Sequence, residues 1–130
     1  MLDDIPPIEA TVVGFRKVNA WQKAHALTLG LYKATRSFPK EELFGLTSQI
    51  RRSACSIGAN IAEGCGRRSK LDFARFLQIA IGSASELEQH LQLAADLDYL
   101  DARVHARFDQ AVVEVKRMLS GFIRKLRSDV

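Results

Sequence analysis

The side chains that could support acid–base or metal chemistry are few and scattered. Glu86, Glu88 and His90 lie within five residues of one another. Carboxylate-bridged metal sites in helical bundles need Glu-x-x-His twice, together with further glutamates that face inward. This chain has Glu-x-x-x-His once, from Glu86 to His90, and His25 and His105 fall on other predicted helices. The pattern therefore predicts no metal site, no catalytic residues and no cofactor.

The two cysteines predict reduced thiols. Cys55 and Cys65 are ten residues apart, so on one helix they are separated by about 15 Å, whereas a disulfide needs Cα atoms about 5.5 Å apart. We interpret Cys55 as a small core residue and Cys65 as a loop thiol. A Cys-His nucleophile pair stays open as an alternative.

The apolar segments and the first residues indicate the compartment. No segment approaches the roughly 18 apolar residues of a membrane span. The opening MLDDIPP is acidic and contains prolines, which is not the pattern of a signal peptide. We expect a cytoplasmic protein without a membrane partner.

Basic side chains form clusters, and they are the features with functional content. The net charge is +4, which permits an acidic partner without requiring one. Phosphates bind lysine and arginine by charge, whereas the loop GCGRRSK has no aromatic residue on which bases could stack. Each cluster could also be an ordinary solvated face. We predict that nucleic-acid phosphates bind Arg51, Arg52, Arg67, Arg68 and Lys70.

A polar stripe follows one face of the predicted helix that carries the first of these clusters. Gln49, Ser56, Asn60 and Glu63 recur at helical spacing. One interpretation is a catalytic cleft at Asn60 and Glu63, but no histidine lies on the same helix to activate a nucleophile. The other is a structural network between helices or subunits, in which these side chains hydrogen-bond to one another and to neighbouring arginines. We predict a structural polar network made of Gln49, Asn60, Glu63, Gly64 and Glu86.

Four helices are predicted to position these side chains, because apolar residues recur every three or four positions in four stretches. The stretches run from about 20 to 36, from 47 to about 63, from 69 to about 97, and from 101 onward. Short links between four helices favour an antiparallel up-and-down arrangement. The sequence therefore predicts an all-α, antiparallel up-and-down four-helix bundle over residues 15–130, preceded by an N-terminal tail over residues 1–14.

Several residues are predicted to begin or end these helices. Asn19 with Gln22, and Ser69 with Asp72, resemble capping boxes. Thr47 and Asp101 are the predicted N-terminal caps of the other two helices. The pair Gly64 and Gly66 is predicted to supply a left-handed cap at the C-terminus of the second helix.

The third predicted helix carries two apolar stripes. A four-helix core uses one of them, so the second needs cover from the N-terminal tail, from a wide bundle face or from another subunit. This second stripe contains Phe76, Ile79, Leu93 and Leu97. We expect a homo-oligomer.

Several blocks of sequence resemble a known family. They include FPKEE at residues 38–42, GLTSQIRRSA at residues 45–54 and NIAEG at residues 60–64. Over residues 15–100 the chain resembles the four-helix bundle proteins first known from intervening sequences in bacterial 23S ribosomal RNA genes. Where that family usually has proline after Ser-Ile, this chain has Gly58, so the kink that proline induces is not required here.

The resemblance implies a left-handed antiparallel bundle that assembles into a homopentameric ring. It also implies similarity to the accessory protein of diversity-generating retroelements, which binds a reverse transcriptase and nucleic acid through a basic surface. We therefore expect a non-enzymatic, pentameric scaffold that binds nucleic acid through repeated basic surface, with RNA favoured and DNA left open. The alternative is a protein–protein adaptor that holds a reverse transcriptase or another enzyme without touching nucleic acid.

Overall fold

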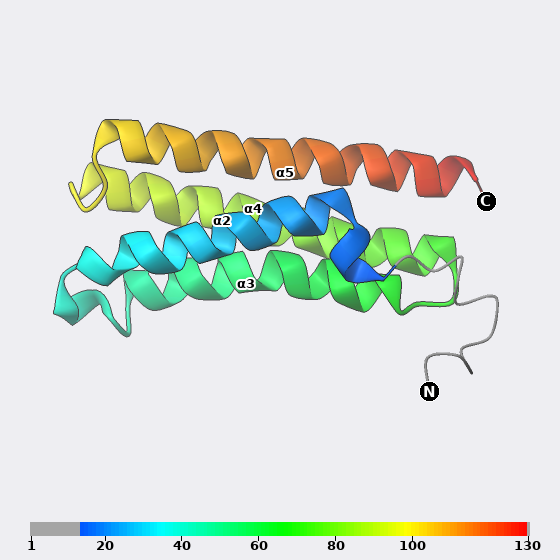
Figure 1. Ribbon diagram of the computed structural model, residues 1–130, viewed down its shortest axis with the longest axis horizontal. Coiled ribbons are helices and arrows are strands. Elements are labelled where there is room, and N and C mark those ends of the chain that lie inside the picture. Colours follow the sequence, from blue (N-terminus) through cyan, green and yellow to red (C-terminus); the bar gives the residue numbers. More distant parts are fainter. Residues whose placement is uncertain (1–13, 130) are drawn as a thin grey trace.

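The fold of residues 14–129, which the computed structural model describes, is entirely helical. The long helices are α2 (Asn19–Ala34), α3 (Leu46–Cys65), α4 (Lys70–Asp96) and α5 (Ala102–Ser128). Short 3-10 helices flank α2: η2 (Phe15–Lys17) before it, and η3 (Thr35–Ser37) and η4 (Lys40–Glu42) after it. The long helices lie side by side and alternate in direction (Figure 1). The predicted all-α four-helix bundle is confirmed, and the handedness of its supercoil stays a prediction.

The connections between helices define the two ends of the bundle. The α2–α3 connection (35–45) and the α4–α5 connection (97–101) lie at the left end in Figure 1. The α3–α4 connection (66–69) lies at the right end, together with the C-terminus of α5. Residues far apart in sequence therefore share one end.

The core is formed by the apolar stripes that the sequence predicts. Each long helix contributes leucine, isoleucine, valine or alanine side chains that are almost fully buried, and burial of each large one stabilises the fold by about 1.5–3 kcal/mol. The largest fully buried apolar side chains are Leu31, Ile50, Ile57, Ile61, Leu77, Leu87, Leu91, Val112, Val115 and Leu119.

Two of the predicted caps form, and two do not. The hydroxyl of Ser69 accepts the backbone N–H of Asp72 (3.0 Å), and the carboxylate of Asp101 accepts that of Val104 (2.8 Å). The cap predicted at Thr47 is wrong, because α3 begins at Leu46 and Thr47 is buried. The capping box predicted at Asn19 is wrong too, since the Gln22 side chain donates instead to the backbone carbonyl of Arg16 (2.8 Å).

The predicted glycine cap after α3 is also wrong. The helix continues through Gly64 to Cys65, and no glycine among residues 14–129 has a positive φ. A Cβ on Gly64 would lie 2.7 Å from Cδ1 of Phe73 and 3.1 Å from Cβ of Phe76. Gly64 therefore lets α3 and α4 approach closely. The left-handed conformation occurs instead at Asp98 (φ 63°), in the α4–α5 connection.

The second apolar stripe of α4 remains largely uncovered within one chain. Ile79, Leu93 and Leu97 are 43%, 43% and 46% exposed, whereas Phe76 is half-buried. The predicted cover by an N-terminal tail concerns residues 1–13, which lie outside the described residues. Helix α3 runs without a break through Gly58, whose Cα faces the indole of Trp21.

Candidate nucleic-acid interface

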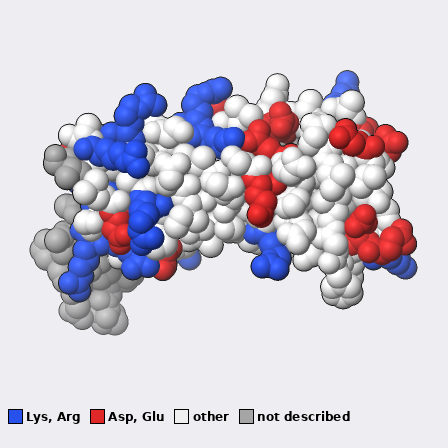
Figure 2. Space-filling model, turned by 180° about the vertical axis from the view of Figure 1, so that it is seen from behind, with Lys and Arg blue, Asp and Glu red and all other residues white. Residues whose placement is uncertain are grey.

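Charge is unevenly distributed along the bundle. Figure 2 shows most lysine and arginine side chains of this face toward one end, and most carboxylates in the middle and toward the other end. The basic end is defined by Arg67, Arg68, Lys70, Arg75, Arg124, Lys125 and Arg127. The acidic end is defined by Glu41, Glu42, Asp96, Asp98 and Asp101, and the same end also carries the exposed basic residues Lys33, Arg36, Lys40 and Arg103.

The basic end is built from two segments that are far apart in sequence and pack against each other. The α3–α4 connection follows the C-terminus of α3, and the last turns of α5 lie beside the start of α4. Lys70 Nζ lies 3.8 Å from the Asp129 carboxylate, and the rings of Phe73 and Phe122 pack edge to face at 5.1 Å. These contacts place the basic residues of α5 at the same end as the α3–α4 connection.

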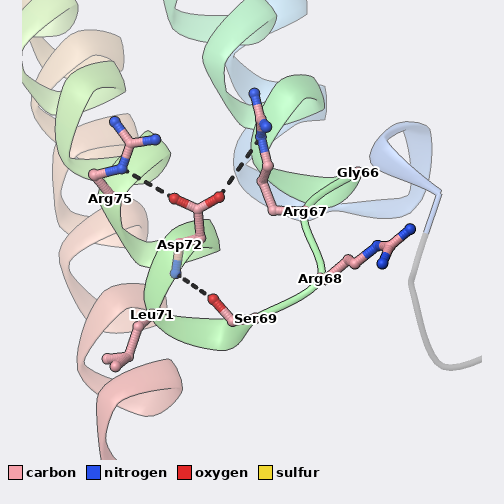
Figure 3. Close-up of a pocket in the computed structure, with 7 residues that line it drawn as sticks. All are labelled: Gly66, Arg67, Arg68, Ser69, Leu71, Asp72 and Arg75. Atoms are coloured by element: carbon pink, nitrogen blue, oxygen red, sulfur yellow. Dashed lines mark hydrogen bonds and ion pairs between the residues drawn. The ribbon is translucent and has the colours of Figure 1, made fainter.

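A shallow hollow opens at this end. Its lining residues are Gly66, Arg67, Arg68, Ser69, Leu71, Asp72 and Arg75. Figure 3 shows Asp72 between two arginines, which come from the α3–α4 connection (Arg67) and from α4 (Arg75). Asp72 lies 3.0 Å from Nε of Arg75 and 3.8 Å from Nε of Arg67.

The arginines of the hollow are only weakly neutralised. Arg67 also pairs with Glu63 (Nη2 to Oε1, 2.7 Å), and the guanidinium groups of Arg67 and Arg75 lie 4.5 and 4.7 Å from the ring centroid of Phe76. Exposed ion pairs of this kind contribute about 0.2–1 kcal/mol each. Phosphate oxygens can therefore replace these carboxylates at small cost.

Arg68 differs from its neighbours. It is exposed, and within residues 14–129 it makes no hydrogen bond and no ion pair. Figure 3 shows its side chain directed away from Asp72. Among the arginines of the hollow, Arg68 is therefore the one for which no carboxylate of the described residues competes with an anion.

The structure separates the other two predicted phosphate-binding residues from this group. Arg51 is half-buried, donates to Thr35 Oγ1 (3.0 Å) and covers the ring of Tyr32 at 4.7 Å, so it joins α3 to the end of α2. Arg52 is exposed but lies fifteen residues before Arg67, about 22 Å along the helix. Arg67, Arg68 and Lys70 therefore do not share one surface with Arg51 and Arg52.

Sequence reasoning missed Arg75 and did not select the basic residues of α5. The signal for Arg75 was local, because Arg75 follows Asp72 by three residues, a spacing at which opposite charges meet on a helix. The inclusion of Arg124, Lys125 and Arg127 depends on packing between α4 and α5. Two further adjacent basic residues of α5 are neutralised: Lys116 pairs with Glu88 (2.6 Å) and Arg117 with Glu114 (2.5 Å).

The predicted polar network is divided among separate contacts. Asn60 donates to the backbone carbonyl (2.8 Å) and hydroxyl (3.1 Å) of Ser56, which in turn hydrogen-bonds to Ser83 of α4 (2.8 Å). Glu63 instead pairs with Arg67. Gln49 and Glu86 are exposed, and the Glu86 carboxylate lies 3.9 Å from Nε2 of His90. The residue that bridges α3 and α4 is therefore Ser83.

The thiols have the reverse of their predicted environments. Cys65 is buried, and burial raises the pKa of its thiol. Cys55 is exposed, with its sulfur 3.6 Å from the hydroxyl of Tyr32, and this hydrogen bond raises the pKa of Tyr32. The small size of Cys55 suggested a core position, but its face of α3 is solvent-exposed. Both cysteines are free thiols.

Among residues 14–129, no three His, Cys, Asp or Glu side chains are arranged so that they could hold a metal ion. None of the helices described is both long and apolar enough to cross a membrane.

Comparisons with known proteins agree with this architecture. The family model of the 23S rRNA-intervening sequence protein matches residues 16–121. The chain is similar to a crystal structure of a protein of unknown function, from the S23 ribosomal protein family of Bacteroides thetaiotaomicron. The identity is 27% and the TM-score 0.75, over 81% of this chain and 95% of that one. No curated protein matches the sequence.

Proposed function

The chain belongs to the family of 23S rRNA-intervening sequence proteins, whose function is unknown, and we propose that it is a non-enzymatic, homo-oligomeric scaffold that binds nucleic acid. The basic end is the proposed contact surface. RNA is the proposed partner, in keeping with the family's name, and the proposed compartment is the cytoplasm.

The observation that carries this proposal is the convergence of basic side chains from two segments of the chain. Arg67, Arg68, Lys70 and Arg75 meet the basic residues of α5 at one end, and the carboxylates among them make only exposed pairs. Such a surface binds phosphates without reading bases. Each phosphate neutralised contributes about 0.7–0.9 to the salt dependence of binding.

Two observations support a non-enzymatic role. The only hydrogen-bond partner of Cys55 among the described residues is Tyr32, and Cys65 is a buried thiol with a raised pKa, so neither has the surroundings of an activated nucleophile. Glu88, a candidate metal ligand by sequence, is engaged with Lys116.

Oligomerisation is supported by the uncovered stripe of α4, since Ile79, Leu93 and Leu97 expose apolar surface that a second copy would bury. The pentamer follows from the family resemblance. In a ring, each basic end is repeated by symmetry, so modest patches become a continuous positive surface. We expect light scattering to give a mass several times that of the monomer.

The nucleic-acid experiment is fluorescence anisotropy of a labelled structured RNA and a matched DNA duplex. Nuclease-treated protein is titrated at about 50 mM and 200 mM salt, and we expect binding to weaken steeply with salt. The double variant R67E/R68E should bind at least about tenfold more weakly at the lower salt. The matched control R103E/R107E makes the same change in net charge on exposed residues of α5 outside the basic end.

Comparison of the two double variants shows whether the interface is localised at the basic end. Equal losses in R67E/R68E and R103E/R107E, with the oligomer intact, would contradict a localised interface. Absence of binding at the lower salt would favour the alternative, an adaptor for a reverse transcriptase or another enzyme. A protein partner recovered in a nuclease-resistant pull-down would then be the supporting result.

A further inference from the structure

The most exposed large apolar side chain lies at the acidic end. Phe44 is 94% exposed, and the preceding Leu43 is exposed as well. Both lie in the α2–α3 connection, directly before α3. An aromatic ring in this position gains nothing from the core of its own chain, and aromatic side chains are enriched among the residues that dominate protein interfaces.

The connection that carries Phe44 is held by hydrogen bonds on both sides. Glu42 accepts the backbone N–H of Leu46 through Oε1 (3.1 Å) and the hydroxyl of Tyr99 through Oε2 (3.0 Å). Gly45 N–H donates to the backbone carbonyl of Glu42 (3.0 Å). Phe44 is therefore presented on a preorganised loop, which reduces the entropy lost on binding.

A second apolar patch lies at the same end, on α4. Leu93 and Leu97 occupy the last turns of that helix, and Leu97 precedes by two residues the Tyr99 that bonds to Glu42. Phe44 and the apolar patch of Leu93 and Leu97 therefore lie at the same position along the bundle axis, but on different elements.

The two surfaces are complementary in charge. Exposed basic residues precede Phe44 along the chain: Lys33, Arg36 and Lys40. Exposed carboxylates precede and follow Leu93 and Leu97 along the chain: Glu86, Asp96 and Asp98. Figure 2, which views the bundle from behind, shows carboxylates gathered toward this end. Glu41 is the exposed carboxylate on the Phe44 side, while Glu42 is engaged with Tyr99.

We propose that Phe44 anchors the contact between neighbouring copies of this chain, seated on Leu93 and Leu97 of the next copy. The inference rests on the homo-oligomer of the proposed function. In a closed ring whose symmetry axis is parallel to the bundle axis, residues at one height along a copy contact residues at the same height on its neighbour. Phe44 can therefore reach the α4 patch, and the contact is head-to-tail in the sense that two different surfaces meet.

This arrangement has a consequence for the basic ends. With Phe44 and its receiving patch at the acidic end, every copy in the ring points the same way. All basic ends then lie on one face of the ring, away from the subunit contact that Phe44 makes. An antiparallel arrangement of copies would instead distribute them over both faces.

The test is a disulfide trap between two separately purified proteins, each carrying Cys55→Ser to remove the exposed native thiol. We expect F44C mixed with L97C to form a cross-linked dimer under mild oxidation. F44C mixed with L71C is the matched control, because Leu71 is exposed at the opposite end. Cross-linking to position 71 rather than 97 would overturn the proposal in favour of end-to-end stacking.

The second measurement is the oligomer itself, by analytical ultracentrifugation over a range of concentrations. F44A should raise the dissociation constant of the assembly at least about tenfold, while L29A, at an exposed leucine of α2, should leave it nearly unchanged. An intact F44A oligomer without the 44–97 cross-link overturns this contact and leaves the scaffold proposal standing. A wild-type monomer at every concentration overturns both the contact and the homo-oligomer.

Discussion

The two ends of the bundle use charge differently. At the acidic end, three of the carboxylates accept hydrogen bonds within the chain: Glu42 from Leu46 and Tyr99, Asp101 from Val104 at the start of α5, and Asp96 from Gln92. At the basic end, Arg68 has no partner in the described part of the chain, and Arg67 and Arg75 share one carboxylate. The carboxylates at the acidic end therefore stabilise the fold, whereas the arginines at the basic end can still bind an anion.

The difference follows from which groups each end must satisfy. Helices α3 and α5 begin at the acidic end, where unpaired backbone N–H groups favour carboxylates. The same helices finish at the basic end, but α2 and α4 run the other way, so the helix dipoles of the bundle oppose one another at each end. The difference therefore lies in the local acceptors: Glu42 serves the start of α3 and Asp101 the start of α5, whereas Ser69 caps α4 at the basic end and leaves the carboxylate of Asp72 to Arg67 and Arg75.

The largest expected effect tests the close packing behind the basic end. Gly64→Ala should destabilise the fold by about 1–3 kcal/mol, because the new Cβ overlaps Phe73 and the helices must move apart. Urea denaturation followed by circular dichroism measures the loss.

Gly66→Ala is the matched control. A Cβ on Gly66 would meet its nearest atom, the Glu63 carbonyl oxygen, at an ordinary 3.6 Å, and its φ of −86° suits alanine. We expect unchanged stability or a gain of about 0.4–1 kcal/mol. Equal losses at both glycines would show that chain flexibility, not helix approach, is the reason for Gly64.

The next effect tests the hydrogen bonds that Glu42 accepts at the acidic end. Glu42→Ala removes the acceptor of both Leu46 N–H and Tyr99 O–H, and should cost about 1–3 kcal/mol of unfolding free energy. Glu41→Ala, at the exposed neighbour, should change stability by less than about 0.5 kcal/mol. Similar losses of unfolding free energy in the two variants would show that the hydrogen bonds of Glu42 do not stabilise the acidic end.

The pH dependence of stability tests the hydrogen bond between Tyr99 and Glu42 by itself. The hydrogen bond to Glu42 raises the pKa of Tyr99 above its ordinary 10.0, since only the neutral phenol can donate. A folded-state pKa that is raised gives stability that is complete below about pH 10 and is lost as pH rises through the raised value. Tyr99→Phe should therefore lose less stability than wild type between pH 9 and 11, measured by denaturation at each pH.

The smallest effect tests the availability of the arginines. Asp72→Asn keeps the shape of the side chain but removes the carboxylate shared by Arg67 and Arg75. We expect RNA affinity at about 50 mM salt to rise about two- to fivefold, the size of an exposed ion pair. Asp109→Asn makes the same charge change away from the basic end and should have less effect. Equal gains would mean that net charge alone governs binding.

Much of the fold could be predicted because its causes are local. The apolar stripes of α2, α3, α4 and α5 repeat at helical spacing, and the caps at Ser69 and Asp101 depend on residues three positions away. Local reasoning failed where a different neighbour acted: Glu42, and not Thr47, serves the start of α3. It failed also at Gly64, whose role lies in the rings of another helix.

The sequence by itself determined the four helices, the faces they bury and the excess of basic residues. Only the tertiary structure decided which charges meet, since helical periodicity gives a residue's face but not the element opposite it. Arg51 is therefore tied to Thr35, and Arg75 joins Arg67 around Asp72. The exposure of Phe44 is decided in the same way, because no other element of the described chain reaches over the α2–α3 connection to cover it.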